Sequence, residues 1–190
     1  MDKFTRELSH ELLKRLTQTT EYGWSRRIEG ALERSDSTAP HEDVAIIVDS
    51  EMGAEEYHIL WDKLYQFIKS DEYFKRSYYR ILLWKHDGLE LVSPKRVSNF
   101  GHLPKYFEEI TVESDVACDW DSFWQFYKPH KKAGQVILLT TADKVEIMRE
   151  SKAIAIRNLL VVYQGGSEAK VKEVIKSIPC IAYISKQAEG

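Results

Sequence analysis

The stretch Val44-Ala-Ile-Ile-Val48-Asp49 decides the fold class of this 190-residue chain. Within this stretch the five residues before Asp49 are all apolar, so the predicted strand has no polar face to turn toward solvent. Such strands lie at the centre of parallel sheets, where helices cover both faces. The stretch therefore predicts a central strand of an α/β domain, with Asp49 at the carboxyl end of that strand.

Helical and strand-like patterns alternate after Asp49. Helices are predicted over 54–74, 120–127, 144–155 and 169–178, and further strands over 78–84, 89–92, 135–139, 159–163 and 181–184. The dipeptide Asp87-Gly88 between two strand-like runs is a strong signal for a tight hairpin. We therefore expect a three-layer α/β/α arrangement around a mostly parallel sheet with one antiparallel edge strand.

The first 42 residues follow a different pattern. Apolar residues recur at the spacing of a helix face from Phe4 to Leu16, and a polar segment around Pro40 is typical of a linker. We expect an N-terminal helical extension over 1–42, followed by one α/β domain over 43–190. The extension either packs across the domain or docks a partner.

The bulk composition argues against several classes of function. A net charge of −3 and a pI near 6.1 are untypical of a purely electrostatic binder of nucleic acid or of a membrane surface. The charged N-terminus does not match a signal peptide, and no apolar run reaches the ~20 residues of a membrane helix. The histidines form no zinc-hydrolase pair. Cys118 and Cys180 lack metal-type spacing, so we expect free thiols in a cytoplasmic protein.

An apolar strand ending in an aspartate, a long helix, a hairpin and three further strand-and-helix units occur in this order over 43–185. This order resembles the von Willebrand factor type A fold, which is Rossmann-like. In that family the loop after the first strand carries Asp-x-Ser-x-Ser, a second loop gives a threonine and a third gives an aspartate. The resemblance implies that such side chains hold Mg²⁺ or Mn²⁺ at the carboxyl ends of the strands, where open α/β sheets bind ligands.

A single position of this chain matches the family's ligands. Asp49 is in place, while Glu51 and Gly53 stand where two serines are expected. Cys118 aligns with the threonine, although a thiol is a poor ligand for a hard cation. Thr141 stands where the aspartate is expected. The resemblance therefore implies a degenerate form of the family's metal-ion-dependent adhesion site.

The resemblance, together with the lack of a complete catalytic motif, favours a non-enzymatic protein-protein interaction module that needs no cofactor. We expect the partner to bind a rim of side chains around Asp49, and the resemblance implies an ATPase or a multi-protein assembly as that partner. The expected partner-binding rim consists of Asp49, Ser50, Glu51, Cys118, Asp119, Thr141 and Asp143.

Two alternatives stay open at the level of sequence. A divalent-metal-dependent hydrolase or nuclease would use Asp49, Asp119 and Asp143 around Mg²⁺ or Mn²⁺. A simpler interpretation of Asp119 and Asp143 is that each caps the helix that follows it. A nucleic-acid binder would use the basic loop Lys128–Lys132 beside several aromatic residues, against the acidic balance of the whole chain.

Overall fold

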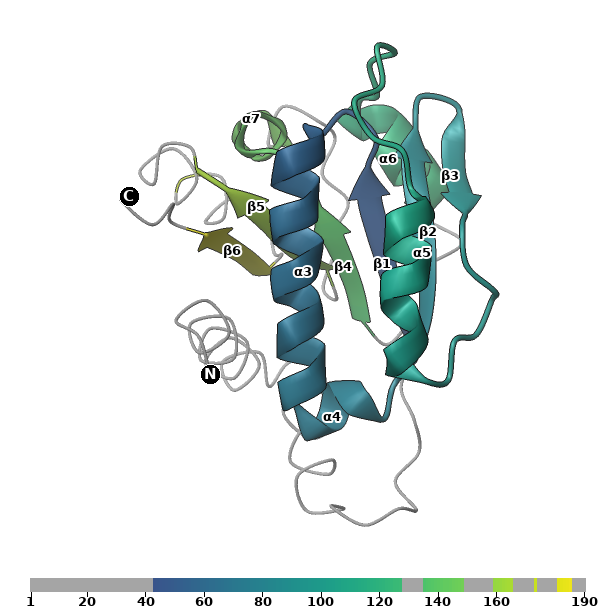
Figure 1. The fold of residues 1–190 in the computed structure, drawn as a ribbon. Coiled ribbons are helices and arrows are strands. Elements are labelled where there is room, and N and C mark those ends of the chain that lie inside the picture. The colour runs from purple at the N-terminus through teal and green to yellow at the C-terminus, as the bar shows by residue number, and fades with distance from the viewer. Residues whose placement is uncertain (1–42, 128–134, 149–158, 166–172, 174–180, 186–190) are drawn as a thin grey trace, which may run out of the picture.

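The computed structural model describes residues 43–127, 135–148, 159–165, 173 and 181–185 (Figure 1). The strands in this part of the chain are β1 (Asp43–Asp49), β2 (Tyr78–Lys85), β3 (Gly88–Leu91), β4 (Gln135–Leu139), β5 (Leu159–Gln164) and β6 (Ile181–Ser185). The helices are α3 (Ala54–Ser70), α4 (Glu72–Lys75), α5 (Leu103–Glu109), α6 (Trp120–Tyr127) and α7 (Ala142–Glu146), with a short 3-10 helix, η2 (Phe100–His102).

The six strands form one sheet in the order β3-β2-β1-β4-β5-β6. β1 pairs in parallel with both β2 and β4, and β5 and β6 continue the sheet in parallel beyond β4. Among these strands only β3 is antiparallel, at the edge beside β2. The prediction of a mostly parallel sheet with one antiparallel edge strand is confirmed. β1 is central, as its buried run from Val44 to Val48 predicted.

The first core lies between the sheet and the helices α3 and α5, which Figure 1 shows side by side in front of the sheet. Val44, Ile46 and Val48 belong to this core. α3 covers them with a stripe at helical spacing, which consists of Tyr57, Leu60, Trp61, Leu64, Phe67 and Ile68. Trp61 stacks on Phe107 of α5, with ring centroids 5.4 Å apart. This stripe of α3 therefore packs on alternate residues of the central strand.

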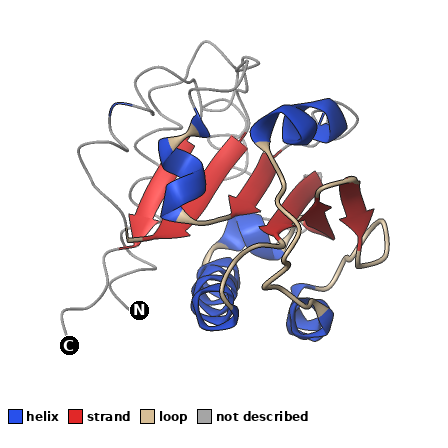
Figure 2. Ribbon diagram, turned by 90° about the horizontal axis from the view of Figure 1, so that it is seen from above, coloured by secondary structure: helices blue, strands red, loops and turns tan. Residues whose placement is uncertain are grey.

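The second core lies on the opposite face and is rich in aromatic side chains. Ala45 and Ile47 contribute from β1, and Trp84 contributes from β2. α6 presents Trp120, Phe123, Trp124 and Tyr127, all buried, to this face. The rings of Trp84 and Phe123 have centroids 4.8 Å apart, an edge-to-face contact. Figure 2 shows helices on both sides of the sheet, so the three-layer α/β/α prediction and the aromatic helix over 120–127 are both confirmed.

Two details of the helices differ from the expectation. The helix predicted over 54–74 is interrupted at Asp71, whose backbone is extended and whose carboxylate accepts a hydrogen bond from the N–H of Phe74 at 3.1 Å. This contact starts the separate helix α4. α5 was not predicted, because its buried residues Leu103 and Phe107 give a single repeat of the helical spacing.

Several predictions fall outside the described residues. They are the N-terminal extension over 1–42, the end of the helix over 144–155, the helix over 169–178 apart from residue 173, the loop Lys128–Lys132 and Cys180. The division of the chain at residue 43 stays a prediction. Within the part of the chain that the structure describes, no helix is long and apolar enough to cross a lipid bilayer.

Candidate functional site

The register of the sheet gathers polar side chains around the end of β1. Asp49 pairs with Trp84 of β2. On the other side Val48 pairs with Leu139, so Thr140 follows as the neighbour of Asp49. Side chains alternate between the two faces of a strand, and Asp49 therefore points to the face that α6 and α7 cover.

The carboxylate of Asp49 is fully buried, at 0% exposure. Its Oδ2 accepts a hydrogen bond from Oγ1 of Thr140 at 2.7 Å, and its Oδ1 accepts one from the backbone N–H of Glu51 at 2.9 Å. Nζ of Lys144 lies 3.4 Å from Oδ2. A buried carboxylate costs several kcal/mol unless charges and hydrogen bonds compensate it. These three contacts provide the compensation for Asp49.

Lys144 lies at the centre of a cluster that it forms with Asp49, Glu51 and Cys118. Its Nζ is 2.5 Å from Oε2 of Glu51, 3.4 Å from Oδ2 of Asp49 and 3.2 Å from Sγ of Cys118. The same ammonium lies 4.2 Å from the centroid of the Trp84 ring, a cation–π contact. The side chain of Lys144 is only 13% exposed. One cation therefore joins the end of β1, the loop after β1 and the loop before α6.

The start of α7 aims Lys144 at this point. Thr141 is the N-cap of α7, and its Oγ1 accepts a hydrogen bond from the backbone N–H of Lys144 at 3.2 Å. Lys144 is thus the third helical residue, from which a side chain reaches back toward the cap. Nε1 of Trp120 donates to the carbonyl of Lys144 at 2.7 Å and ties α6 to α7. Because Thr141 is the cap, α7 begins at Ala142, two residues before the predicted start.

The loop before α6 brings Cys118 to the same cluster. The backbone N–H of Cys118 donates to Oε2 of Glu51 at 3.1 Å, and the buried thiol lies 3.2 Å from the same oxygen. The loop is fixed beside the end of β1 because the N–H of Ser114 donates to the carbonyl of Ser50 at 2.9 Å. Cys118 is a free thiol, as predicted.

Burial and the neighbouring charges set the protonation of the cluster. Burial alone would lower the pKa of Lys144, but the charge of Asp49 and the hydrogen bond to Glu51 outweigh it and raise that pKa. Burial alone would raise the pKa of Glu51, but hydrogen bonds from Lys144 and Cys118 outweigh it and lower that pKa. Burial, aided by the charge of Asp49, raises the pKa of the Cys118 thiol to about 12. At neutral pH the Glu51 carboxylate therefore faces an ammonium and a neutral thiol, which is a poor nucleophile.

The family resemblance implies a divalent cation beside Asp49, and the contacts within the cluster decide whether such an ion fits. One ligand atom from each of Asp49, Glu51 and Cys118 lies within 4.8 Å of the other two. The ammonium of Lys144 already contacts all three side chains. A second cation there would be repelled by that ammonium, and the thiol is a poor ligand for Mg²⁺. The cluster suits an internal ammonium better than a hard divalent ion.

The other residues of the expected rim have different positions. Ser50 is buried, and its hydroxyl has no hydrogen-bond partner among the described residues. Asp119 is exposed and caps α6, as predicted, by accepting a hydrogen bond from the N–H of Ser122 at 2.7 Å. Asp143 is exposed, and the interpretation that it caps α7 is wrong because Thr141 does so. Asp119 and Asp143 thus lie outside the close group formed by Asp49, Glu51 and Cys118.

Lys144 and Trp84 were missed by the sequence reasoning. The spacing Thr141-x-x-Lys144 held a usable signal, because a capping threonine directs the third helical side chain back toward the loop before the helix. Nothing in the local sequence of Trp84 identifies it as the wall of a cation site. Its role depends on the pairing of β2 with β1.

Comparisons with known proteins give little beyond the fold. No protein-family model matches the chain, and no curated protein matches it. Among solved structures, a von Willebrand factor type A protein from Catenulispora acidiphila is similar, with 13% sequence identity and a TM-score of 0.45. The match covers 80% of this chain and 40% of that one, so the chain spans less than half of that protein's length. The strand order itself defines the fold class, which is α/β of the von Willebrand type A-like and Rossmann-like kind.

Proposed function

We propose that the chain is a non-enzymatic protein-protein interaction module that binds its partner through the rim around Asp49. The observation that carries this proposal is the position of exposed apolar side chains. Three large hydrophobic residues are exposed among the described residues: Leu91 at 41%, Val116 at 50% and Ile147 at 47%. Val116 lies in the loop that delivers Cys118, and Ile147 follows directly after α7, which carries Lys144. A patch of apolar side chains rimmed by polar residues marks a protein-binding surface, and we propose that Val116 and Ile147 form such a patch.

The charge of the rim indicates the chemistry of the partner. The segments 49–56, 111–121 and 140–146 contain ten Asp and Glu residues, and Lys144 is their single Lys or Arg. That one cation is turned inward, to Glu51 and Asp49. The negative charges of Asp49 and Asp143 also contribute, after burial, to a raised pKa of Glu56 at the start of α3. We therefore propose a partner with a positively charged contact surface, since complementary charges speed association and select partners.

The chemistry of the cluster supports a binding function over a catalytic one. The ionisable groups nearest to Asp49 contact each other, and the Cys118 thiol is protonated at neutral pH. A general base or nucleophile needs a free lone pair that faces a substrate. In the cluster, Asp49 and Glu51 direct carboxylate oxygens to Lys144 and to hydrogen-bond donors of the chain.

As the partner we propose an ATPase or another member of a multi-protein assembly in the cytoplasm.

A capture experiment with matched surface variants tests this proposal. The full chain is used as bait, together with the double variant Val116→Asp/Ile147→Asp at the rim and with Leu91→Asp as an exposed control on β3. We expect a protein partner to be retained by the wild-type chain and by Leu91→Asp and to be lost by the rim variant. Capture that weakens with added salt would agree with the acidic rim.

Two outcomes would contradict the proposal. One is a partner that the rim variant retains as well as the wild type, with circular dichroism confirming that the variant is folded. The other is the failure of the wild-type chain to retain any protein in repeated captures at low salt. Either result would move the binding surface away from the rim or remove this function.

A further inference from the structure

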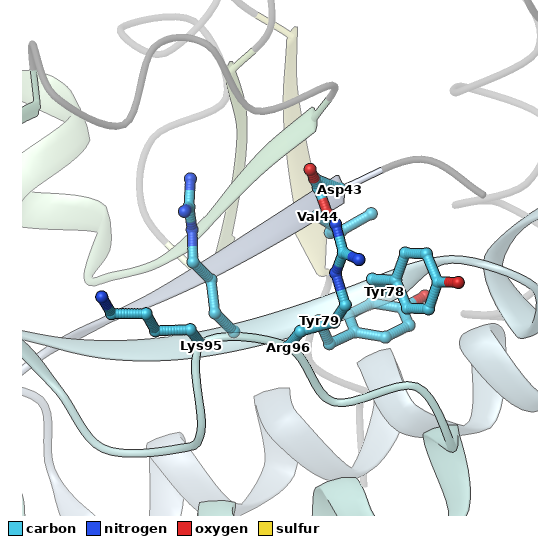
Figure 3. A pocket seen from close by; sticks show the side chains of 7 residues that line it. Asp43, Val44, Tyr78, Tyr79, Lys95 and Arg96 are labelled. Carbon is cyan, nitrogen blue, oxygen red and sulfur yellow. Dashed lines mark ion pairs between the residues drawn. The ribbon is translucent and has the colours of Figure 1, made fainter. Parts of the chain in front are cut away.

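The amino edge of the sheet contains a pocket that the proposed function does not use. It lies where β1 and β2 begin and has a volume of about 190 Å³. Figure 3 shows that Asp43 and Val44 contribute from β1, Tyr78 and Tyr79 from β2, and Lys95 and Arg96 from the connection after β3. Arg80 of β2 completes the lining. The pocket is thus built from three separate segments of the described chain.

The lining is positively charged. Arg80, Lys95 and Arg96 contribute three cations and Asp43 contributes the one carboxylate, so the formal charge of the lining is +2. Within the described residues, neither Arg80 nor Lys95 forms an ion pair, although the chain as a whole has a net charge of −3. Cations that gather in a hollow without matching carboxylates favour an anionic ligand.

Arg80 provides a second and independent observation. Its Nε is buried, and it has no hydrogen-bond partner among the described residues. A buried donor without an acceptor is unfavourable, and a charged one more so, because the donor has lost its water and gained nothing in return. Arg80 lines the pocket, so an acceptor that enters the pocket lies beside this guanidinium.

The one ion pair of the pocket is weak enough to rearrange. Nη2 of Arg96 lies 3.9 Å from Oδ1 of Asp43, and both side chains are more than half exposed. Exposed pairs of this kind contribute little to stability. The guanidinium of Arg96 also lies over the Tyr78 ring, 4.4 Å from its centroid, which holds it beside the pocket (Figure 3).

We propose that this pocket binds the phosphate group of a small phosphorylated molecule. A dianionic phosphate matches the +2 charge of the lining, and arginine forks match phosphate oxygens in geometry. The volume of about 190 Å³ exceeds that of an engineered cavity of about 150 Å³ that holds a benzene ring, so a phosphate group with a short substituent fits. A small ligand is favoured over a nucleic acid because the cations are confined to one hollow of an acidic chain.

Titration of the full chain with phosphate probes tests the proposal. Inorganic phosphate and glycerol phosphate are titrated separately by calorimetry, in a buffer without other multivalent anions and at constant ionic strength. We expect one site per chain with a dissociation constant on the order of 0.1–1 mM, as a few charge-assisted hydrogen bonds would give. Tighter binding of glycerol phosphate would identify a phosphate ester as the ligand, and equal binding would identify free phosphate.

Variants then locate the site. Arg80→Met and the double variant Lys95→Gln/Arg96→Gln should each weaken binding by about tenfold or more, the effect of losing charged hydrogen bonds. Asp43→Asn should strengthen binding, because it removes the one competing carboxylate. The matched control is Lys69→Gln/Lys105→Gln, which removes the same charge from exposed positions on α3 and α5 and should leave the affinity unchanged.

The proposal is overturned by any of three results. The first is the absence of any heat of binding up to about 20 mM phosphate, a concentration far above the expected dissociation constant. The second is an equal loss of affinity in the Lys69→Gln/Lys105→Gln control. The third is an unchanged affinity in Arg80→Met. A single-stranded oligonucleotide that binds more tightly than either probe, and loses binding in the pocket variants, would replace the small ligand by a nucleic acid.

Discussion

At the carboxyl edge of the sheet, the ammonium of Lys144 contacts Glu51 and the fully buried Asp49. Toward the amino edge, Arg80 pairs with Ala45, four residues before Asp49 along β1, and its guanidinium has a buried Nε without an acceptor among the described residues. Both edges combine cations with aromatic rings, Lys144 with Trp84 and Arg96 with Tyr78. The first edge has built-in carboxylates that contact its cation, whereas the second sets a single carboxylate, that of Asp43, against three cations.

The difference shows how the same kind of side chain serves structure at one edge and is available for binding at the other. A cation between built-in carboxylates stabilises the loops that supply them, and its removal leaves a buried charge uncompensated. A cation without a partner contributes little to the fold and is available for a ligand. Substitutions that remove one cation from each edge therefore test the comparison directly.

The largest effect is expected for Lys144→Met, which keeps the length of the side chain but removes the charge. Asp49 would then be buried without its cation, and we expect the free energy of unfolding to fall by about 3–5 kcal/mol, the usual result of breaking a buried ion pair. Urea denaturation followed by circular dichroism measures this loss.

A double variant separates this charge effect from a loss of packing. Asp49→Asn/Lys144→Met removes both charges and should be more stable than Lys144→Met alone. Millimolar Mg²⁺ should raise the melting temperature of Lys144→Met more than that of the wild type, since the ammonium no longer repels the ion. Equal stabilisation of the two chains by Mg²⁺ would show that Lys144 does not take the place of a cation.

The sequence predicted the fold well because the deciding signals are local. The apolar run Val44–Val48, the Asp87-Gly88 hairpin and the aromatic spacing of α6 each span a few residues. The composition of the site could not be predicted in the same way. Lys144 meets Asp49 only because β1 pairs with β4 in one register and Thr141 caps α7. Long-range pairing of this kind leaves no local pattern.

The same limit applies at the amino edge. Arg80 stands in the apolar run Tyr78–Trp84, where alternation predicts a side chain on one face of a strand and says nothing about its partners. Lys95 and Arg96 meet Arg80 through the connection after β3, where Val97 forms an isolated bridge with Tyr79. The pocket is therefore a product of tertiary structure.

A smaller effect is expected for Glu51→Gln, which weakens the contacts with Lys144 and Cys118. Because the pKa of Glu51 is lowered in the folded chain, its ionised form stabilises the fold above the ordinary value of 4.5. This stabilisation is lost as the pH falls below 4.5 through the lowered pKa. At pH 7 we expect the variant to be less stable by about 1–2 kcal/mol, the contribution of charged hydrogen bonds.

The difference between Glu51→Gln and the wild type should shrink when urea denaturation is repeated at successively lower pH below 4.5. A difference that stayed constant down to strongly acidic pH would mean that the charge of Glu51 has no part in the effect. Glu55→Gln, an exposed neighbour in the first turn of α3, is the matched control and should change stability little at any pH.

A still smaller effect is expected for Glu113→Ala. Glu113 has a left-handed backbone with φ 66°, and its Oε1 accepts a hydrogen bond from the N–H of Ala54 at 2.9 Å. It thus caps α3 from another loop, since Gly53 supplies no side-chain cap. Loss of a cap costs about 1 kcal/mol. Glu113→Gln keeps an acceptor and should retain most of the stability in the same denaturation assay. Equal losses in both variants would show that the charge, rather than the cap, matters.

The smallest effect is expected for Arg80→Met, the counterpart of Lys144→Met at the other edge. The substitution keeps the apolar stem and removes a buried N–H group that has no acceptor among the described residues. In buffer without phosphate, we expect the free energy of unfolding to fall by no more than about 0.5 kcal/mol, because no contact of the cation is lost and an unpartnered buried donor is removed. A loss as large as that of Lys144→Met would mean that Arg80 also serves the fold, and the two edges would then no longer differ in kind. A small change in stability, combined with a large loss of phosphate affinity, is the result that separates a cation kept for structure from one kept for a ligand.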